Sequence, residues 1–316
     1  MTNLEYSRII MDDLKIAIIG QSAFSADFLK LMVSKKYKIC GVFTPLDDAK
    51  TGREDVLAST AKQLNLPVFK VKRWRVPPET NKAIPEVFEQ YKALGADLNV
   101  LPFCNQFIPM EVINFPKLKS INYHPSLLPR HRGAAAINWT LIEGDKEAGF
   151  TIFWTDDGLD TGPILMKKSC YVEPNDTVDS LYSRFMYPEG IKALEESVNL
   201  IKQKLAPQIV QPEEGATYDP ILRGKDERTV IDFKRLDTAD KLHNFIRGMD
   251  KVPGAWTQIK LAGSSDQFEK VKLFSSTKYH IEDYGIPEAL RTVKLEGLER
   301  DAIVHAGGLL MFANGD

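Results

Sequence analysis

The sequence predicts an α/β protein with a doubly wound, mostly parallel sheet and a second, smaller β-barrel domain. Three observations lead to this fold class. Short apolar runs alternate with stretches of helical periodicity from residue 14 to about residue 202; an aperiodic stretch with proline, glutamate and glycine follows; and the segments beyond it are short and separated by turn residues. We therefore expect a first domain over 14–205, a linker over 206–218 and a small barrel over 219–316.

The first domain is predicted from strands that alternate with amphipathic helices, which is the pattern of parallel βαβ units. The opening apolar run stops at Gly20, and Phe24, Phe28 and Met32 then recur at the spacing of one helical face. Pro188 should interrupt the last helix because proline has no backbone N–H to donate. The predicted strands cover 14–19, 37–44, 67–71, 97–101, a short stretch ending at 124, 150–154 and 164–166, and the helices cover 24–32, 58–64, 84–94 and about 177–201.

The second domain is predicted from several short strands with glycine and proline turns, which favour a small barrel of the open five-stranded, OB-like kind. The segments are 230–233, 256–261, 271–274, 302–305 and 309–312, with a helix at 239–247. Asn314 and Gly315 form a pair favoured in two-residue hairpins, and no returning strand follows. We therefore expect the barrel to be truncated and the natural polypeptide to continue.

Composition excludes several functional classes. The 316 residues are 43% apolar and 27% charged, with a net charge of −2, whereas proteins that bind nucleic-acid phosphates normally carry a basic surplus. There is no apolar run long enough to span a bilayer. Three widely spaced cysteines form neither a disulfide framework nor a metal pattern. We expect no nucleic-acid or membrane partner, no metal, and a cytoplasmic location; the first 13 residues read as a tail or leader.

The most informative motif is Asn122-Tyr123-His124, which closes a short strand and leads into a proline-bounded loop. Alternate side chains of a strand share a face, so Asn122 and His124 should lie side by side. The carboxyl ends of parallel strands are where open α/β sheets place their binding crevices. The motif therefore predicts a neutral hydrogen-bond donor beside a titratable imidazole at such a crevice.

The motif resembles the formyltransferases and hydrolases that use 10-formyltetrahydrofolate, which carry Asn-x-His on a strand, an SLLP loop and a distant Leu-Asp-x-Gly. Here the last element is Leu159-Asp160-Thr161-Gly162. Within that family, the strings at 101–109, 187–190 and 250–256 are similar to the amino-terminal hydrolase domains of 10-formyltetrahydrofolate dehydrogenases. The likeness runs from about residue 15 to the end of the chain.

The resemblance implies a role for each matching residue. Asn122 would donate its amide to the formyl oxygen as charge builds there, and His124 would protonate the leaving nitrogen. Asp160 would hold His124 and orient or deprotonate the attacking water, and it would also contact the substrate. Gln106, Phe107 and Ile108 resemble a loop whose backbone recognises the pterin edge of the folate.

Simpler interpretations compete at several of these positions. Phe107 and Ile108 could be plain core residues, and Asp156 and Asp157 read as turn aspartates that cap their own backbone. Cys104 has no adjacent histidine in sequence, so we do not expect it to be a nucleophile. The basic run 130–132 could meet the glutamate carboxylates of a folate or could be a solvated loop.

The resemblance implies hydrolysis of 10-formyltetrahydrofolate to tetrahydrofolate and formate. The alternative is formyl transfer to an amine, as in methionyl-tRNA or sugar-amine formyltransferases, and a non-enzymatic folate sensor is a third possibility. Gly20 stands alone where G-x-G-x-x-G would be needed, so this chain should bind no nicotinamide. NADP and 4'-phosphopantetheine are expected only in the full-length protein, on dehydrogenase and carrier domains of the same polypeptide.

Overall fold

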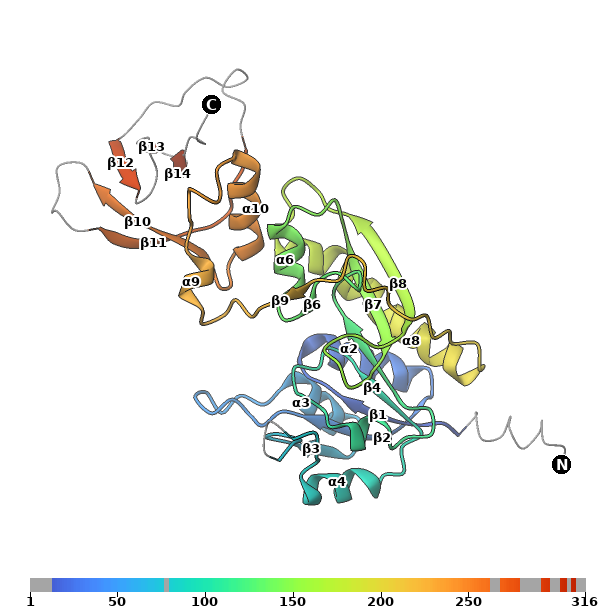
Figure 1. Cartoon of the computed structure of the whole chain (residues 1–316). Helices are drawn as coiled ribbons and strands as arrows, with labels where there is room; N and C mark the ends of the chain where they lie inside the picture. Colours follow the sequence, from blue (N-terminus) through green and yellow to red (C-terminus); the bar gives the residue numbers. More distant parts are fainter. Residues whose placement is uncertain are drawn as a thin grey trace, which may run out of the picture. The chain divides into compact units, whose positions relative to one another are not determined.

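The computed structural model describes residues 13–76, 80–261, 268–278, 291–295, 302–305 and 308–310. Its chain divides into two compact units (Figure 1). The first unit comprises residues 1–132, 149–169 and 184–217, and the second comprises 133–148, 170–183 and 218–316. Two segments that the sequence groups with the first domain, 133–148 and 170–183, therefore make most of their contacts in the second unit.

The first unit is built on a seven-stranded sheet in the order β3-β2-β1-β4-β5-β7-β8. The strands from β3 to β5 are all parallel to their neighbours, whereas β7 runs antiparallel to β5. The chain winds outward from β1 through β2 and β3 and then returns to β4, so the order reverses between β1 and β4. The strands are β1 Lys15–Ile19, β2 Lys38–Thr44, β3 Val68–Lys70, β4 Leu98–Leu101, β5 Ser120–His124, β7 Glu147–Trp154 and β8 Ile164–Tyr171.

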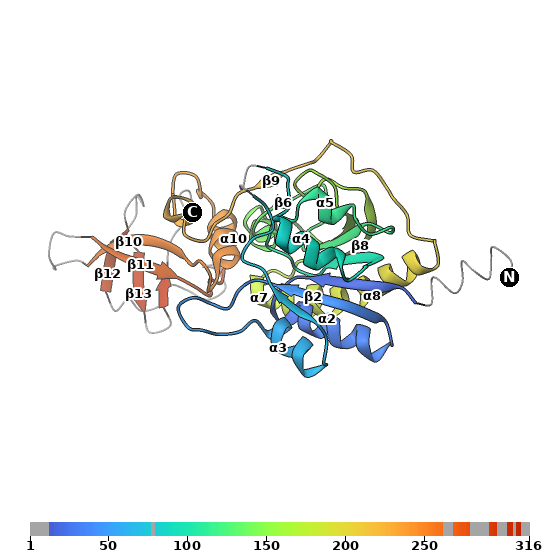
Figure 2. The same ribbon diagram turned by 90° about the horizontal axis from the view of Figure 1, so that it is seen from below.

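Helices cover both faces of this sheet, which confirms the predicted α/β fold with a mostly parallel sheet (Figure 2). Helix α2 (Ser22–Ser34) packs against α3 (Val56–Gln63) and α8 (Tyr187–Lys202) on one face. On the other face lie α4 (Pro85–Lys92) and the short α5 (Met110–Ile113). Buried aromatic rings, among them Phe43 and Trp74 with centroids 5.0 Å apart, fill the core on that side.

The predicted interruption at Pro188 takes the form of a π-helix. Helix α7 (Val178–Leu181) begins with a capping box at Thr177, and the π-helix Tyr182–Met186 joins it to α8. Pro188 is the second residue of α8, and because it has no N–H it cannot donate to a carbonyl of the preceding π-helical turn. The wider helical turn thus leaves the proline at the start of a new α-helix.

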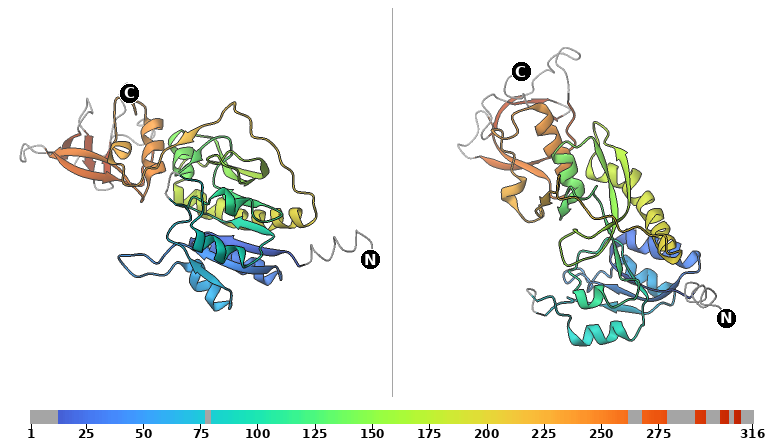
Figure 3. Two further views of the ribbon diagram at one scale, coloured as in Figure 1. Left: turned by 60° about the horizontal axis from the view of Figure 1, so that its bottom comes forward. Right: turned by 45° about the vertical axis from the view of Figure 1, so that its right-hand side comes forward.

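The second unit combines an antiparallel sheet with a pair of packed helices. Helix α10 (Ala239–Met249) lies against α6 (Ala136–Ile142), seen in Figure 3 as an orange helix beside a green one. The five strands run in the order β11-β10-β12-β13-β14, and each strand is antiparallel to its neighbours. They are β10 Ala255–Leu261, β11 Glu269–Leu273, β12 Arg291–Leu295, β13 Ala302–His305 and β14 Gly308–Leu310, and α9 (Asp226–Thr229) precedes them.

One predicted strand of this unit is wrong. Residues 230–233 form no strand: Val230 makes a single parallel bridge to Trp256, while Ile231 and Phe233 turn into an apolar cluster around α10. Apolar residues that alternate because they pack under a helix give the same pattern as a strand. Residues 311–312 of the predicted last strand, like residues 1–12, lie outside the described ranges. No helix in the described part of the chain is both long enough and apolar enough to cross a bilayer.

Candidate active site at the carboxyl end of β5

Asn122 and His124 stand at the carboxyl end of β5, one residue apart on the same face. In the ladder Asn122 lies opposite Leu101 of β4 and Phe153 of β7, and His124 lies opposite Thr151. The side-chain oxygen Oδ1 of Asn122 is enclosed and has no hydrogen-bond partner. An enclosed polar atom without a partner costs free energy, so such atoms in native structures usually have a functional reason.

The imidazole of His124 lies between two oxygens. Its Nδ1 is 3.5 Å from Oδ2 of Asp160, and its Nε2 is 2.7 Å from the carbonyl oxygen of His131. Because both ring nitrogens face acceptors, only the doubly protonated ring can donate to both. The Nδ1–Oδ2 separation is longer than an ordinary hydrogen bond but short enough for the carboxylate to orient the imidazole. The structure thus brings together the three residues that the sequence singled out.

The turn that carries Asp160 is held by its own side chains and glycines. Oδ1 of Asp156 accepts hydrogen bonds from the backbone N–H of Gly158, at 3.2 Å, and from the hydroxyl of Thr161, at 2.8 Å. This confirms Asp156 as a turn residue, whereas Asp157 instead accepts from the side-chain amide of Asn81. A Cβ atom at Gly162 would overlap the carbonyl oxygen of Trp154, so only glycine fits there.

The loop after β5 is anchored by Thr151 on the neighbouring strand. The hydroxyl of Thr151 accepts a hydrogen bond from the N–H of Leu128, at 3.0 Å, and donates to the carbonyl of Ser126, at 2.7 Å. The hydroxyl of Ser126 in turn donates to the carbonyl of Arg130 at 2.7 Å. These bonds fold the loop back so that the carbonyl of His131 reaches His124.

The basic run 130–132 is not the solvent-facing cluster that the sequence suggested. His131 and Arg132 are 3% and 1% exposed, and only Arg130 reaches the surface. Neither His131 nor Arg132 is therefore open to the carboxylates of a bound folate. A charged side chain this deeply buried needs hydrogen-bond partners, and sequence alone does not reveal which residue supplies them.

Gln211 is one of the residues that supply hydrogen bonds to the buried Arg132. It was not predicted as a site residue because it falls in the expected linker. Its Oε1 accepts from Nε and Nη2 of Arg132, at 3.2 and 2.9 Å. Its Nε2 donates to the carbonyls of Asp160 and Gly162, at 2.9 and 2.8 Å. The only available signal in the sequence is a glutamine within an otherwise proline- and glutamate-rich stretch.

The loop of Gln106, Phe107 and Ile108 follows β4, next to β5. The side chain of Gln106 is hydrogen-bonded within the protein. Its Oε1 accepts from Nε1 of Trp74 at 3.1 Å, and its Nε2 donates to the carbonyl of Val71 at 2.9 Å. Phe107 is 64% exposed, which contradicts the core interpretation for this ring, whereas Ile108 packs partly against the core. The carbonyl of Gln106 accepts from the thiol of Cys104 at 3.5 Å, so within this loop it is the exposed ring of Phe107 that faces outward.

The end of β1 does not fit a dinucleotide. A Cβ at Gly20 would lie 2.5 Å from the carbonyl oxygen of Pro102, so this glycine serves the close approach of two loops. The first N–H of α2, on Ser22, donates to both carboxylate oxygens of Asp55, each at 3.1 Å. A carboxylate therefore stands where the pyrophosphate would need the helix N-terminus, and the two negative charges would repel.

Neither a thiol nucleophile nor a metal ion is indicated among the described residues. Burial raises the pKa of the Cys104 thiol to about 11, so this thiol stays protonated at neutral pH and is a poor nucleophile. Among the described residues, no three His, Cys, Asp or Glu side chains gather in a way that could hold a metal ion.

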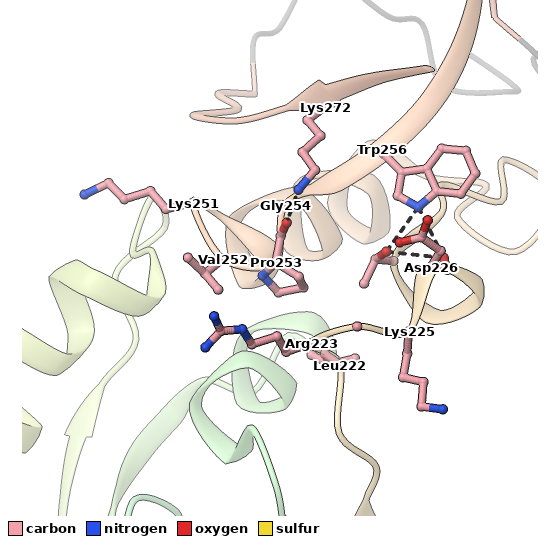
Figure 4. Close-up of a pocket in the computed structure, with 12 residues that line it drawn as sticks. Leu222, Arg223, Lys225, Asp226, Lys251, Val252, Pro253, Gly254, Trp256 and Lys272 are labelled. Carbon is pink, nitrogen blue, oxygen red and sulfur yellow. Dashed lines mark hydrogen bonds between the residues drawn. The ribbon is translucent and has the colours of Figure 1, made fainter. Parts of the chain in front are cut away.

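A pocket of about 300 Å³ lies in the second unit, beside the start of α9 (Figure 4). Its rim carries several basic side chains, but Lys225 and Lys251 extend in opposite directions, and Nζ of Lys272 donates to the carbonyl of Pro253 at 2.6 Å. The cations do not converge on a common point. The candidate active site is therefore the group at the end of β5.

Known proteins of two kinds, formyl transferases and 10-formyltetrahydrofolate dehydrogenases, are similar to this chain. The family model for formyl transferases matches residues 14–198. The chain is 51% identical over 301 residues to a mitochondrial 10-formyltetrahydrofolate dehydrogenase of Homo sapiens and 50% identical over 301 residues to a cytosolic one of Xenopus laevis. Each alignment covers 95% of this chain but only 30% and 31% of the relative, so the chain spans about a third of their length.

Among solved structures, a 4-N formyltransferase from Francisella tularensis superimposes with a TM-score of 0.62. The match covers 84% of this chain and 99% of that one at 17% sequence identity. At this identity the likeness concerns the fold alone, and it agrees with an α/β fold built on a mostly parallel sheet.

Proposed function

The chain belongs to the formyl transferase family, and from that premise we propose that it hydrolyses 10-formyltetrahydrofolate to tetrahydrofolate and formate. The observation that supports this most is the juxtaposition at the end of β5: a half-buried amide on Asn122, on the same face as His124, whose Nδ1 is 3.5 Å from Asp160. An amide donor, an imidazole and a carboxylate are the groups that cleavage of a formamide by water requires.

In the proposed reaction the oxygen of water forms a bond to the formyl carbon, and the carbon–nitrogen bond to N10 breaks. Asn122 donates to the formyl oxygen as it becomes negative, and such a donor is worth about 3 kcal/mol in the transition state. Asp160 takes a proton from the attacking water, and the protonated His124 gives one to the departing nitrogen. The products are tetrahydrofolate and formate, with no redox change.

The substrate is proposed to lie along the loop after β4, with backbone groups of Gln106 to Ile108 recognising the pterin. The exposure of Phe107 supports this, because 64% of the residue is accessible although the guanidinium of Arg75 lies 4.6 Å from its ring centroid. Asp160 would contact the same substrate near its formyl group.

Several wider properties belong to the same proposal. We propose that residues 14–205 form the catalytic domain and 219–316 a small OB-like barrel, which the antiparallel sheet β10–β14 supports. In a full-length protein, carrier and NADP-dependent dehydrogenase domains of the same polypeptide would receive the formyl group through a 4'-phosphopantetheine arm. The names of the longer relatives support a dehydrogenase domain, and the poor fit of a dinucleotide at Asp55 supports a nicotinamide site outside residues 14–205. We also propose a cytoplasmic location, as for the cytosolic relative of Xenopus laevis. The mitochondrial relative of Homo sapiens makes mitochondria the alternative location.

The test is to incubate the purified chain with 10-formyltetrahydrofolate alone and to measure formate and tetrahydrofolate. Equal amounts of the two products, formed without nicotinamide and unchanged by prior dialysis against a chelator, are expected. Formyl release only in the presence of an added amine, with the formyl group on that amine, would instead establish a transferase. Tight folate binding without any product would make the chain a sensor.

A further inference from the structure

We propose that Gln211 is a positioning residue that fixes the turn bearing Asp160 against His124, an assignment that rests on the hydrolase function proposed above. Gln211 lies beyond residues 14–198, the part that matches the family model. It belongs to the stretch 206–218 that the sequence predicts to be a linker, and residues 206–217 of that stretch are part of the first unit. This segment is anchored there at several points, including a bridge between Ile209 and Ile164 and the carbonyl of Pro207, which accepts from Trp154.

The amide of Gln211 has only one workable orientation. On one side it meets two carbonyl groups, those of Asp160 and Gly162, which need donors. On the other side it meets the guanidinium of Arg132, which needs an acceptor. Gln211 and Arg132 are 5% and 1% exposed, so water cannot readily replace these bonds. A reversed amide would lose all four contacts, and the side chain is therefore held rigidly.

The same segment also reaches the partner of the other catalytic side chain. Six residues after Gln211, the hydroxyl of Thr217 accepts from the N–H of His131 at 2.7 Å, and the carbonyl of Thr217 accepts from the N–H of Arg132 at 2.9 Å. The carbonyl of His131 lies 2.7 Å from Nε2 of His124. The segment thus binds the backbone of Asp160 directly, and it also binds the backbone of His131, whose carbonyl contacts His124.

Asp160 needs such support because of its backbone. Its φ of +56° lies in the left-handed region, which costs free energy for a residue other than glycine and persists only where the surroundings enforce it. The hydrogen bonds that Gln211 donates to the carbonyls of Asp160 and Gly162 hold the turn in place on both sides of Thr161. Without them the turn can relax, and a displacement of about 1 Å at Oδ2 is enough to reduce a catalytic rate about 100-fold.

The sharpest test is Gln211→Glu compared with Gln208→Glu. Glutamate has nearly the same shape as glutamine, and its carboxylate can still accept from the guanidinium of Arg132. Its second oxygen, however, faces the carbonyls of Asp160 and Gly162 and cannot donate to them. The hydrogen bonds to the turn are therefore lost, while the buried Arg132 keeps an acceptor. Gln208 lies three residues away in the same segment and is exposed. It therefore receives the same change in charge without touching the turn. The measurements are kcat and KM for hydrolysis, the Kd for tetrahydrofolate, the thermal midpoint and the imidazole NMR signals of His124.

At a temperature where both variants are folded, Gln211→Glu is expected to lower kcat by about 10- to 100-fold, to shift the His124 signals, and to leave the Kd for tetrahydrofolate close to that of Gln208→Glu. Its thermal midpoint should be lower than that of Gln208→Glu, because two buried carbonyls lose their donor. Unchanged kcat and unchanged His124 signals would overturn the proposal. So would a loss of kcat that is matched by a fall in thermal midpoint and restored by lowering the temperature, because that is the signature of a purely structural residue. If the unmodified chain releases no formate, the hydrolase function fails, and the His124 signals alone decide the role of Gln211.

Discussion

Replacing Asn122 by alanine should slow hydrolysis strongly and leave stability almost unchanged. If its amide stabilises the oxyanion, losing about 3 kcal/mol of transition-state stabilisation corresponds to a roughly 100- to 1000-fold lower kcat. The effect on folding is small because Oδ1 is enclosed without a partner. Removing an unsatisfied oxygen recovers about 1–3 kcal/mol, which offsets the packing lost with the amide. The thermal midpoint should therefore stay within about 3 °C of the unmodified chain.

Asn99, on the neighbouring strand β4, is a matched control with the opposite expected result. Its Oδ1 accepts from Tyr91 at 2.8 Å, and its Nδ2 donates to the carbonyl of Val112 and the hydroxyl of Ser120, each at 3.0 Å. Asn99→Ala leaves these buried groups without hydrogen-bond partners and should lower the free energy of unfolding by about 2–4 kcal/mol. Its kcat at a temperature where the variant is folded should change little.

The assay is formate release at several substrate concentrations, together with thermal unfolding of both variants. An Asn122→Ala variant with unchanged kcat and a raised KM would show a ground-state contact rather than an oxyanion donor. A large fall in its thermal midpoint would show that Asn122 is structural, and either result refutes the reasoning.

Three further predictions follow from other residues. Asp160→Ala and His124→Ala should each abolish formate release while circular dichroism stays unchanged, and near-normal activity of either variant would reject the mechanism. Burial lowers the pKa of His243 below 6.5, so the unfolded chain binds this proton more readily; the free energy of unfolding should fall as the pH drops below about 6.5, and His243→Asn should flatten that slope in pH-dependent denaturation. Because the pKa of Cys104 is about 11, iodoacetamide at pH 8 should leave hydrolysis intact, and a loss of activity that Cys104→Ser prevents would contradict this.

The sequence was sufficient for features that depend on local pattern. Strands β1 to β5 and the interruption at Pro188 follow from apolar runs, helical periodicity and the missing N–H of one residue. The strand alternation that places Asn122 and His124 on one face is equally local. The family resemblance, rather than any pattern, pointed from His124 to Asp160 across the intervening loop.

What the sequence could not show depends on contacts between distant residues. Arg132 looks like a surface cation in a basic run, and it is buried because Gln211, 79 residues later, returns to meet it. Gln211 in turn looks like part of a linker, since its neighbours are polar and aperiodic. Residues 230–233 alternate like a strand because two of them pack into the cluster beneath α10.

The carboxylate of Asp55 has a consequence for how this fold can change its ligand during evolution. Besides its two bonds to the start of α2, its Oδ1 accepts from the N–H of Leu57 at 2.8 Å and so caps α3. A mutation that cleared this position for a phosphate group would leave two helices without their first hydrogen-bond acceptor at once. Acquiring a nucleotide site at β1 would therefore cost about 1 kcal/mol for the lost cap of α3 alone, unless a replacement cap arose.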